Sequence, residues 1–228
     1  MLKPKKKIKK GNVEKEPLVE KVDAAEEFIR NNSKIVTGIL IGLAAVVVVL
    51  VFMFRSKAKA NRMASGELGI ATQSLARGDT SDASLRLEDI TAQYPGTDSA
   101  NLAFALLGKI AMARRNYSQA IDYFNNYLNE NKKEDIFTIQ VLHGLANCYY
   151  IQEDYTGAAQ KYLEAADLAP HPFQKNSSLL NAAKCYLTTS NTKRASELIS
   201  RVKESKPEEQ EIKNKLNRLE NQLAARNI

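Results

Sequence analysis

Residues 107–127 read LGKIAMARRNYSQAIDYFNNY, and residues 145–165 read LANCYYIQEDYTGAAQKYLEA. Both stretches begin with a large apolar residue and a small one. Both have Asn or Asp followed by tyrosine at their centre, and both continue with an alanine and then an aromatic residue. Apolar side chains recur at helical spacing on each side of the centre. The pattern therefore predicts two helices joined by a short turn, with small residues where the helices approach closely.

The same frame extends over four units. A small residue of the second helix recurs at intervals of 37, 38 and 37 residues, and a larger apolar side chain follows it by four residues. Another small residue precedes it by twelve, and prolines close three of the units. These positions are Ala83, Ala120, Ala158 and Ala195; then Leu87, Phe124, Tyr162 and Ile199; then Ala71, Gly108, Ala146 and Ala183; and finally Pro95, Pro170 and Pro207.

This period resembles the tetratricopeptide repeat, whose usual unit is about 34 residues. The likeness is strongest between Leu102 and Pro170. It implies stacked helical hairpins in a right-handed superhelix with a concave groove, and the polar stretch 208–226 then becomes a final capping helix. Composition favours the same all-α fold, because the 228 residues include no Trp and only 10 Gly and 6 Pro.

A second feature is the uncharged segment IVTGILIGLAAVVVVLVFMF at residues 35–54. Twenty residues of helix reach roughly 30 Å, which is the thickness of the hydrocarbon core of a bilayer. A buried core helix is usually shorter, and a cleaved signal peptide has a shorter apolar region and a shorter leader. We therefore expect a basic tail with a short amphipathic segment at 1–34, a transmembrane helix at 35–54, a juxtamembrane linker at 55–63 and a repeat domain at 64–228.

The distribution of charge bears on orientation and on partners. The chain carries a formal net charge of +7, but residues 1–34 hold ten Lys/Arg against six Asp/Glu, which leaves 23 against 20 in the remainder. A nearly balanced repeat domain argues against nucleic acid as a partner. The basic tail favours a cytoplasmic N-terminus and a repeat domain on the other side of the membrane.

No pattern for chemistry emerges. His143 and His171 lack metal-ligand spacing, and the chain has no phosphate-binding loop or nucleophile motif. We expect no catalytic activity, no cofactor, no metal and no small-molecule substrate. Cys148 and Cys185 occupy equivalent places in successive units and are predicted to be buried free thiols, because stacked helices lie too far apart for a disulfide. Free thiols weigh slightly toward a reducing compartment.

If the repeats bind a partner, the first helices of the hairpins should line the site. Positions opposite the hairpin partner form a mixed apolar and weakly basic set, which suits a peptide or helix with apolar anchors and some acidic character. Plain solvated surface is the competing interpretation of each side chain. The predicted groove residues are Ala105, Lys109, Met112, His143, Asn147, Tyr150, Leu180, Lys184 and Leu187.

The whole architecture is similar to the YfgM family of bacterial inner-membrane proteins. The likeness rests on the charged tail, on Phe28 shortly before the Asn-Asn-Ser-Lys run at residues 31–34, on the glycine-containing span and on the repeats. It implies a cytoplasmic N-terminus, periplasmic repeats and a role as an ancillary subunit of the SecYEG translocon. Its implied partners are the lipid bilayer, a PpiD-like membrane chaperone and exported polypeptides. The alternative is a structural scaffold for another complex, in the envelope or on the cytoplasmic face of the membrane.

Overall fold

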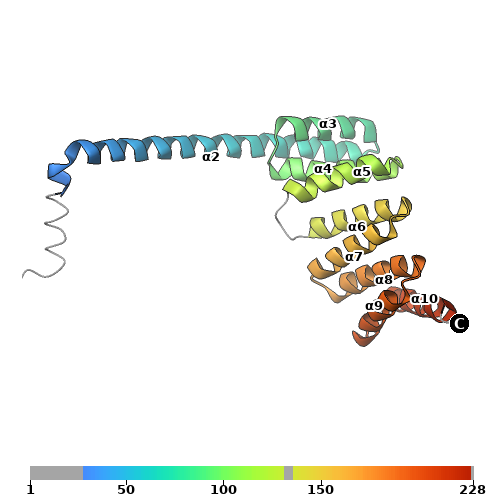
Figure 1. Ribbon diagram of the computed structural model, residues 1–228. Helices are drawn as coiled ribbons and strands as arrows, with labels where there is room; N and C mark the ends of the chain where they lie inside the picture. Colours follow the sequence, from blue (N-terminus) through green and yellow to red (C-terminus); the bar gives the residue numbers. More distant parts are fainter. Residues whose placement is uncertain (1–27, 131–135, 227–228) are drawn as a thin grey trace, which may run out of the picture. The chain divides into compact units, whose positions relative to one another are not determined.

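The computed structural model describes residues 28–130 and 136–226, and every element of regular structure in these ranges is an α-helix (Figure 1). The all-α prediction is confirmed. The chain divides into two compact units, Met1–Ser56 and Lys57–Ile228. Most of the basic tail predicted at residues 1–34 lies outside the described residues. Residues 28–31 are helical.

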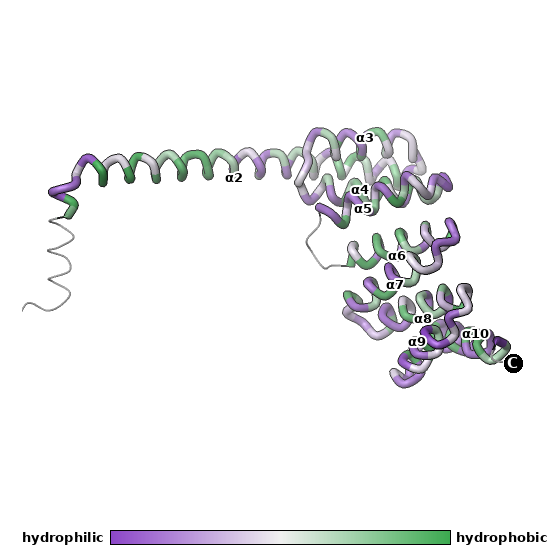
Figure 2. The backbone as a smooth tube through the Cα atoms, in the orientation of Figure 1, coloured by the Kyte–Doolittle hydropathy of each residue, from purple (hydrophilic) through white to green (hydrophobic). Residues whose placement is uncertain are grey.

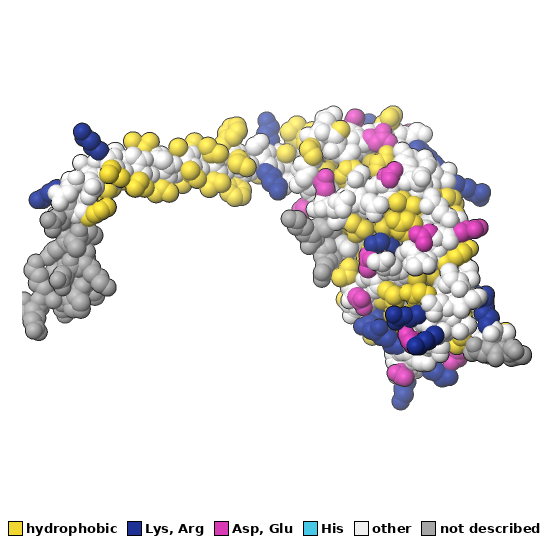
Figure 3. Space-filling view, viewed as in Figure 1, with side chains coloured by type: hydrophobic (Ala, Val, Ile, Leu, Met, Phe, Trp, Pro, Cys, Tyr) yellow, Lys and Arg dark blue, Asp and Glu magenta, His cyan; other side chains and the backbone are white. Residues whose placement is uncertain are grey.

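Helix α2, Ser33–Ala76, is 44 residues long. An 18-residue window of it has a mean hydropathy of 3.1, and none of that window is buried. Figure 2 shows the apolar stretch with hydrophilic residues beyond both of its ends, and Figure 3 shows Lys and Arg side chains there. Among the described residues this helix alone has the length and composition to cross a membrane, as an anchor or as a signal segment. Residues 55–63, predicted to be a linker, are helical throughout.

The second unit contains the end of α2 and eight further helices in the described ranges. They alternate in direction along the stack and form hairpins of consecutive helices, with one helix left over at the C-terminus (Figure 1). The predicted hairpins and final helix are thus present. The helices are α3 Thr80–Gln93, α4 Asp98–Ala113, α5 Tyr117–Glu130, α6 Ile136–Ile151, α7 Tyr155–Leu168, α8 Pro172–Thr188, α9 Thr192–Glu204 and α10 Gln210–Arg226.

One turn recurs inside every hairpin. An Asx residue caps the second helix: Asp154 Oδ1, for example, accepts the backbone N–H of Gly157 at 2.8 Å. The backbone N–H of the same Asx donates to a carbonyl five residues back, at 2.9 Å from Asp154 to Tyr149. The residue before the Asx has positive φ in all four turns. The four pairs are Gly78-Asp79, Arg115-Asn116, Glu153-Asp154 and Ser190-Asn191.

Small residues allow the helices to pack closely. The repeated alanines Ala83, Ala120, Ala158 and Ala195 are all fully buried, as the period predicted. The ring of Phe124 lies between two glycines of neighbouring hairpins. A Cβ added to Gly108 of α4 would lie 2.4 Å from this ring, and one added to Gly144 of α6 would lie 2.7 Å from it. Phe124 therefore joins the second hairpin to the third.

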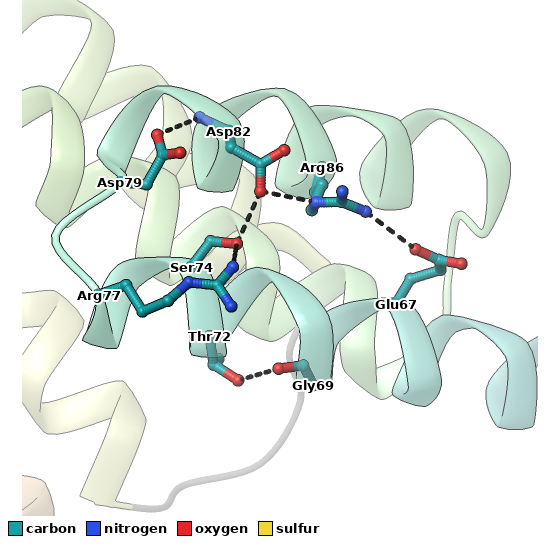
Figure 4. A network of polar contacts seen from close by, with 8 residues as sticks. All are labelled: Glu67, Gly69, Thr72, Ser74, Arg77, Asp79, Asp82 and Arg86. Carbon is teal, nitrogen blue, oxygen red and sulfur yellow. Dashed lines mark hydrogen bonds and ion pairs between the residues drawn. The ribbon is translucent and has the colours of Figure 1, made fainter.

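The first hairpin is held by a network of charged and polar side chains (Figure 4). Ser74 of α2 is fully buried, and its hydroxyl donates to Asp82 of α3 at 2.6 Å. Arg86 also donates to Asp82, at 2.8 Å, and its guanidinium lies 3.9 Å from Glu67 of α2. Hydrogen bonds from Arg86 and Ser74 lower the pKa of Asp82 below its ordinary value. Asp82, Arg86 and Glu67 thus each have an opposite charge beside them.

Candidate functional site

A hollow of about 450 Å³ lies among the first helices of three successive hairpins. Its walls come from α4, α6 and α8, and the ring of Phe124 on α5 closes part of its floor. This is the face that the repeat frame predicted for a partner. The lining residues are Lys109, Met112, Phe124, Ile136, Ile139, Gln140, His143, Gly144, Asn147, Phe173, Gln174 and Ser177.

One side of the hollow is apolar and partly open to solvent. Ile136, at the start of α6, is 42% exposed, and Phe173, near the start of α8, is 37% exposed. Met112 and Ile139 continue the apolar lining inward. Exposed large apolar side chains at the mouth of a hollow provide anchoring contacts for a partner's side chain.

The other side of the hollow is polar. Lys109 Nζ donates to Gln140 Oε1 at 3.0 Å, and the hydroxyl of Tyr162 donates to Asn147 Oδ1 at 2.5 Å. The side-chain oxygen of Gln174 is buried and accepts no hydrogen bond from the described residues. Because this oxygen has almost no solvent-accessible surface, a bound segment would reach it only after the surrounding side chains move.

His143 connects the third hairpin to the fourth. Its Nε2 lies 2.7 Å from the hydroxyl oxygen of Ser178, which itself donates to the backbone carbonyl of Gln174 at 2.9 Å. The hydroxyl proton is therefore engaged, and Nε2 carries the proton in this contact. Burial, aided by the charge of Lys215, lowers the pKa of His143. The imidazole thus has a structural role as a neutral donor.

The two cysteines are free and buried, as predicted. Burial raises the pKa of each thiol to about 11, so neither is a reactive thiolate near neutral pH. His171 is exposed at the N-cap of α8 and makes no capping hydrogen bond through its side chain. Within residues 28–130 and 136–226 no group of three His, Cys, Asp or Glu side chains could hold a metal ion.

The structure places the nine predicted groove residues in three groups. Lys109, Met112, His143 and Asn147 line the hollow. Tyr150 and Lys184 lie beside each other, with Lys184 Nζ 4.5 Å from the centre of the Tyr150 ring. The remaining three are buried in the core and present no surface to a ligand: Ala105, Leu180 and Leu187. Contact of the other six with a partner stays a prediction.

The sequence reasoning missed the mouth of the hollow. Ile136, Gln140, His143 and Asn147 lie at helical spacing along α6, so the frame needed only to be extended by two turns toward the start of the helix. Phe173 and Ser177 hold the corresponding places on α8. That signal was available.

The comparisons with known proteins agree with this architecture. Residues 68–135 match the family model described as tetratricopeptide repeat. The unit Lys57–Ile228 is a stack of tetratricopeptide-like helical hairpins. That family acts as a scaffold for protein–protein interaction and is generally non-catalytic. The first two of the four hairpins provide most of the matched segment.

Three solved structures are similar in fold. A structure of putative kinesin light chain nearly identical TPR-like repeats from Podosopora anserina has 17% identity and a TM-score of 0.57, over 74% of this chain and 89% of that one. A tetratricopeptide repeat protein from Parabacteroides merdae ATCC 43184 has 15% identity and a TM-score of 0.60, over 72% and 61%. Pseudomonas aeruginosa pilF has 18% identity and a TM-score of 0.53, over 72% and 69%.

At these identities the likeness shows the fold alone. No curated protein matches the chain.

Proposed function

We propose that this protein is a membrane-anchored adaptor that holds protein partners beside a bacterial inner membrane. In the fuller form of the proposal it is an ancillary subunit of the SecYEG translocon. It would associate with a PpiD-like membrane chaperone and receive exported polypeptides in the groove of its repeats. The repeat scaffold supplies the binding surface, and the apolar part of α2 supplies the anchor.

The observation that carries the proposal is the hollow formed by α4, α6 and α8. An apolar mouth at Ile136 and Phe173, beside amide groups at Gln140, Asn147 and Gln174, fits a polypeptide, which offers apolar side chains and backbone N–H groups together.

The anchor rests on the exposure of the apolar part of α2. Residues 35–54 are uncharged and all of them except Val36 are exposed, and leaving such a surface in water is unfavourable by roughly 25 cal/mol per Å². A bilayer removes this cost, and a helix satisfies every backbone group inside it. The nine residues 55–63 separate the span from Ala64, the first buried residue of the repeats.

A pull-down with the full-length protein in mild detergent tests the function. Wild type should recover SecYEG and a PpiD-like chaperone. The Phe173→Asp variant should recover much less of any partner that binds in the groove, because it puts a charge at the mouth of the hollow. The substitution should not disturb folding, because an aspartate is favourable in the first turn of α8. Leu85→Asp is the matched control, because Leu85 is 65% exposed on α3, outside the hollow. Recovery of neither component by wild type contradicts the translocon role.

The orientation is tested separately. A compartment-specific reporter fused after Ile228 should be active only in its periplasmic form, as the basic tail predicts. A cytoplasmic signal would contradict the periplasmic assignment. It would favour the scaffold on the cytoplasmic face, a compartment in which the buried thiols Cys148 and Cys185 would also be expected.

A further inference from the structure

Lys215 of α10 occupies an unusual place for a lysine. The buried residues Ile212, Leu216 and Leu219 define the face of α10 that packs against the array, and Lys215 lies on that face among them. Its Nζ donates to the side-chain oxygen of Asn181 on α8, a neutral group. Burial lowers the pKa of Lys215. A partly desolvated ammonium is thus paired only with an amide.

The charges around Lys215 are mostly of the same sign. Lys184 of α8 and Arg218 of α10 act on it as positive charges, and Glu211 is the acidic group that opposes them. Neither Lys215 nor Lys184 has a carboxylate within 4.0 Å among the described residues; Lys184 lies instead over the ring of Tyr150. Three cations, Lys215, Lys184 and Arg218, therefore meet one acidic group, Glu211, at this corner of the array, and neither Lys215 nor Lys184 forms a close ion pair.

The position of Lys215 is fixed by the packing of α10. Arg226, at the end of the helix, donates to the carbonyl of Leu187 at the end of α8 and to the hydroxyl of Ser190 in the turn between α8 and α9. Lys203 of α9 pairs with Glu220 at 2.8 Å. A lysine on a helix held at several points is preorganised, so little conformational entropy is lost when it meets a ligand.

The cationic corner continues the surface of the hollow. Ser177, Asn181 and Lys184 follow one another at helical spacing along α8, and Asn147 and Tyr150 do so along α6. Ser177 lines the hollow, while Asn181 and Lys184 belong to the corner. Seven residues of helix separate Ser177 from Lys184, which is about 10 Å.

We propose that Lys215, together with Lys184, forms a subsite for an acidic side chain of the bound polypeptide. This inference rests on the adaptor function proposed above and specifies its ligand. The partner segment carries an apolar residue that enters the hollow and an Asp or Glu about 10 Å away from it. That separation corresponds to about three residues of extended chain or two turns of helix. The final helix is then part of the binding surface as well as a cap.

Two peptide pools test the subsite. The full-length protein in detergent is titrated with fluorescent 12-residue peptides that contain one Leu and two Asp at varied spacing, and with a matched pool that has Asn in place of Asp. Wild type should bind the Asp pool about tenfold more tightly at low salt. This preference should shrink at high salt, because screening weakens charge pairing.

The variants locate the effect. Lys215→Gln should reduce the preference for Asp about fivefold, and Lys215→Arg should retain most of it because the positive charge is kept. Lys213→Gln is the control: Lys213 lies on the same helix but is exposed on its other side, and removing this charge should leave the preference unchanged. Equal losses for Lys213→Gln and Lys215→Gln would overturn the subsite, since they would show a general charge effect.

The remaining outcomes distinguish a failure of the acidic subsite from a failure of the proposed peptide-binding groove. If both pools bind equally well and Phe173→Asp weakens both, the groove binds peptides and only the acidic subsite is refuted. If neither pool binds wild type, the peptide-binding groove and the subsite are both refuted.

A thermal melt tests whether Lys215 has a structural role. Lys215→Met should melt at the same temperature as wild type or a few degrees above it, because the substitution removes a charge without an ion-pair partner from a desolvated site. A large drop would mean that Lys215 has a structural role instead.

Discussion

The two ends of the repeat array differ in how their charged side chains are paired. In the first hairpin Arg86 lies between Asp82 and Glu67, and the buried hydroxyl of Ser74 completes the network. At the last hairpin Lys215 donates to Asn181 and Lys184 lies over Tyr150, and neither lysine has a carboxylate within 4.0 Å among the described residues, although Glu211 attracts Lys215 from farther away. Paired charges hold two helices together, whereas an unpaired charge stabilises nothing until a ligand supplies its partner. The charges of the first hairpin therefore have a structural role, and we assign a binding role to those of the last hairpin.

Phe124, in the middle of the array, should give the largest effect. Phe124→Ala leaves a cavity between Gly108 and Gly144 and should cost about 3–5 kcal/mol of unfolding free energy. Because this ring joins the second hairpin to the third, its loss should also separate the unfolding of the two ends. Urea denaturation followed at both ends would show two transitions in place of one. A single transition with unchanged midpoint would contradict the role given to Phe124.

Ser74 tests the paired end. Ser74→Ala removes the hydroxyl that donates to Asp82 and accepts from Arg77, and should lower the unfolding free energy by about 1–2 kcal/mol. Ser118→Ala, on the exposed surface of α5, is the control and should change little. The network would be dispensable if both substitutions had the same effect.

The turns of the hairpins also differ between the first hairpin and the later ones, in the residue that holds the positive-φ position. The first has glycine at its positive-φ position, Gly78, whereas later turns hold Arg115, Glu153 and Ser190 in this strained conformation. Glu153→Gly should therefore raise the unfolding free energy by about 0.5–1 kcal/mol, and Gly78→Ala should lower it by a similar amount. Thermal melts of the two variants, compared with wild type, should shift in opposite directions.

Asp82 should give the smallest and most specific effect, on pH dependence. Its folded-state pKa lies below its ordinary value of 3.8 because of hydrogen bonds from Arg86 and Ser74. The stability that it confers is complete above the ordinary value and is lost as the pH falls through the folded-state pKa. Unfolding midpoints measured from pH 6 to pH 2 should therefore fall more steeply below pH 4 for wild type than for Asp82→Asn. Parallel curves would show that Asp82 is unpaired in solution.

The repeat frame was predictable because each unit must bury the same face of its helices. Three local signals recur with the period of the repeat: an alanine of the second helix, a large apolar residue four positions later, such as Phe124 or Tyr162, and an Asx at each turn. The frame located the α6 face of the hollow through His143 and Asn147. These features follow from spacing alone.

The burial of groove positions and the contacts of the last helix depend on tertiary packing, so the repeat spacing did not predict them. Leu180 and Leu187 were assigned to the groove by counting, but α10 packs over that part of α8 and the core buries both side chains. The contact between Lys215 and Asn181 joins residues 34 positions apart, outside the period of the repeat. No spacing rule within one hairpin could have shown that the last helix contributes to the groove.

The central claim is that the face of α4, α6 and α8 holds protein partners at the membrane. A photocrosslinking amino acid placed at Gln140, an exposed residue of the hollow, tests it most directly in intact cells, with the same residue at Leu85 as reference. The account predicts adducts from position 140, and not from position 85, that contain a translocon subunit, a PpiD-like chaperone or an exported polypeptide. Adducts of equal yield at both positions, or none from position 140, would contradict it.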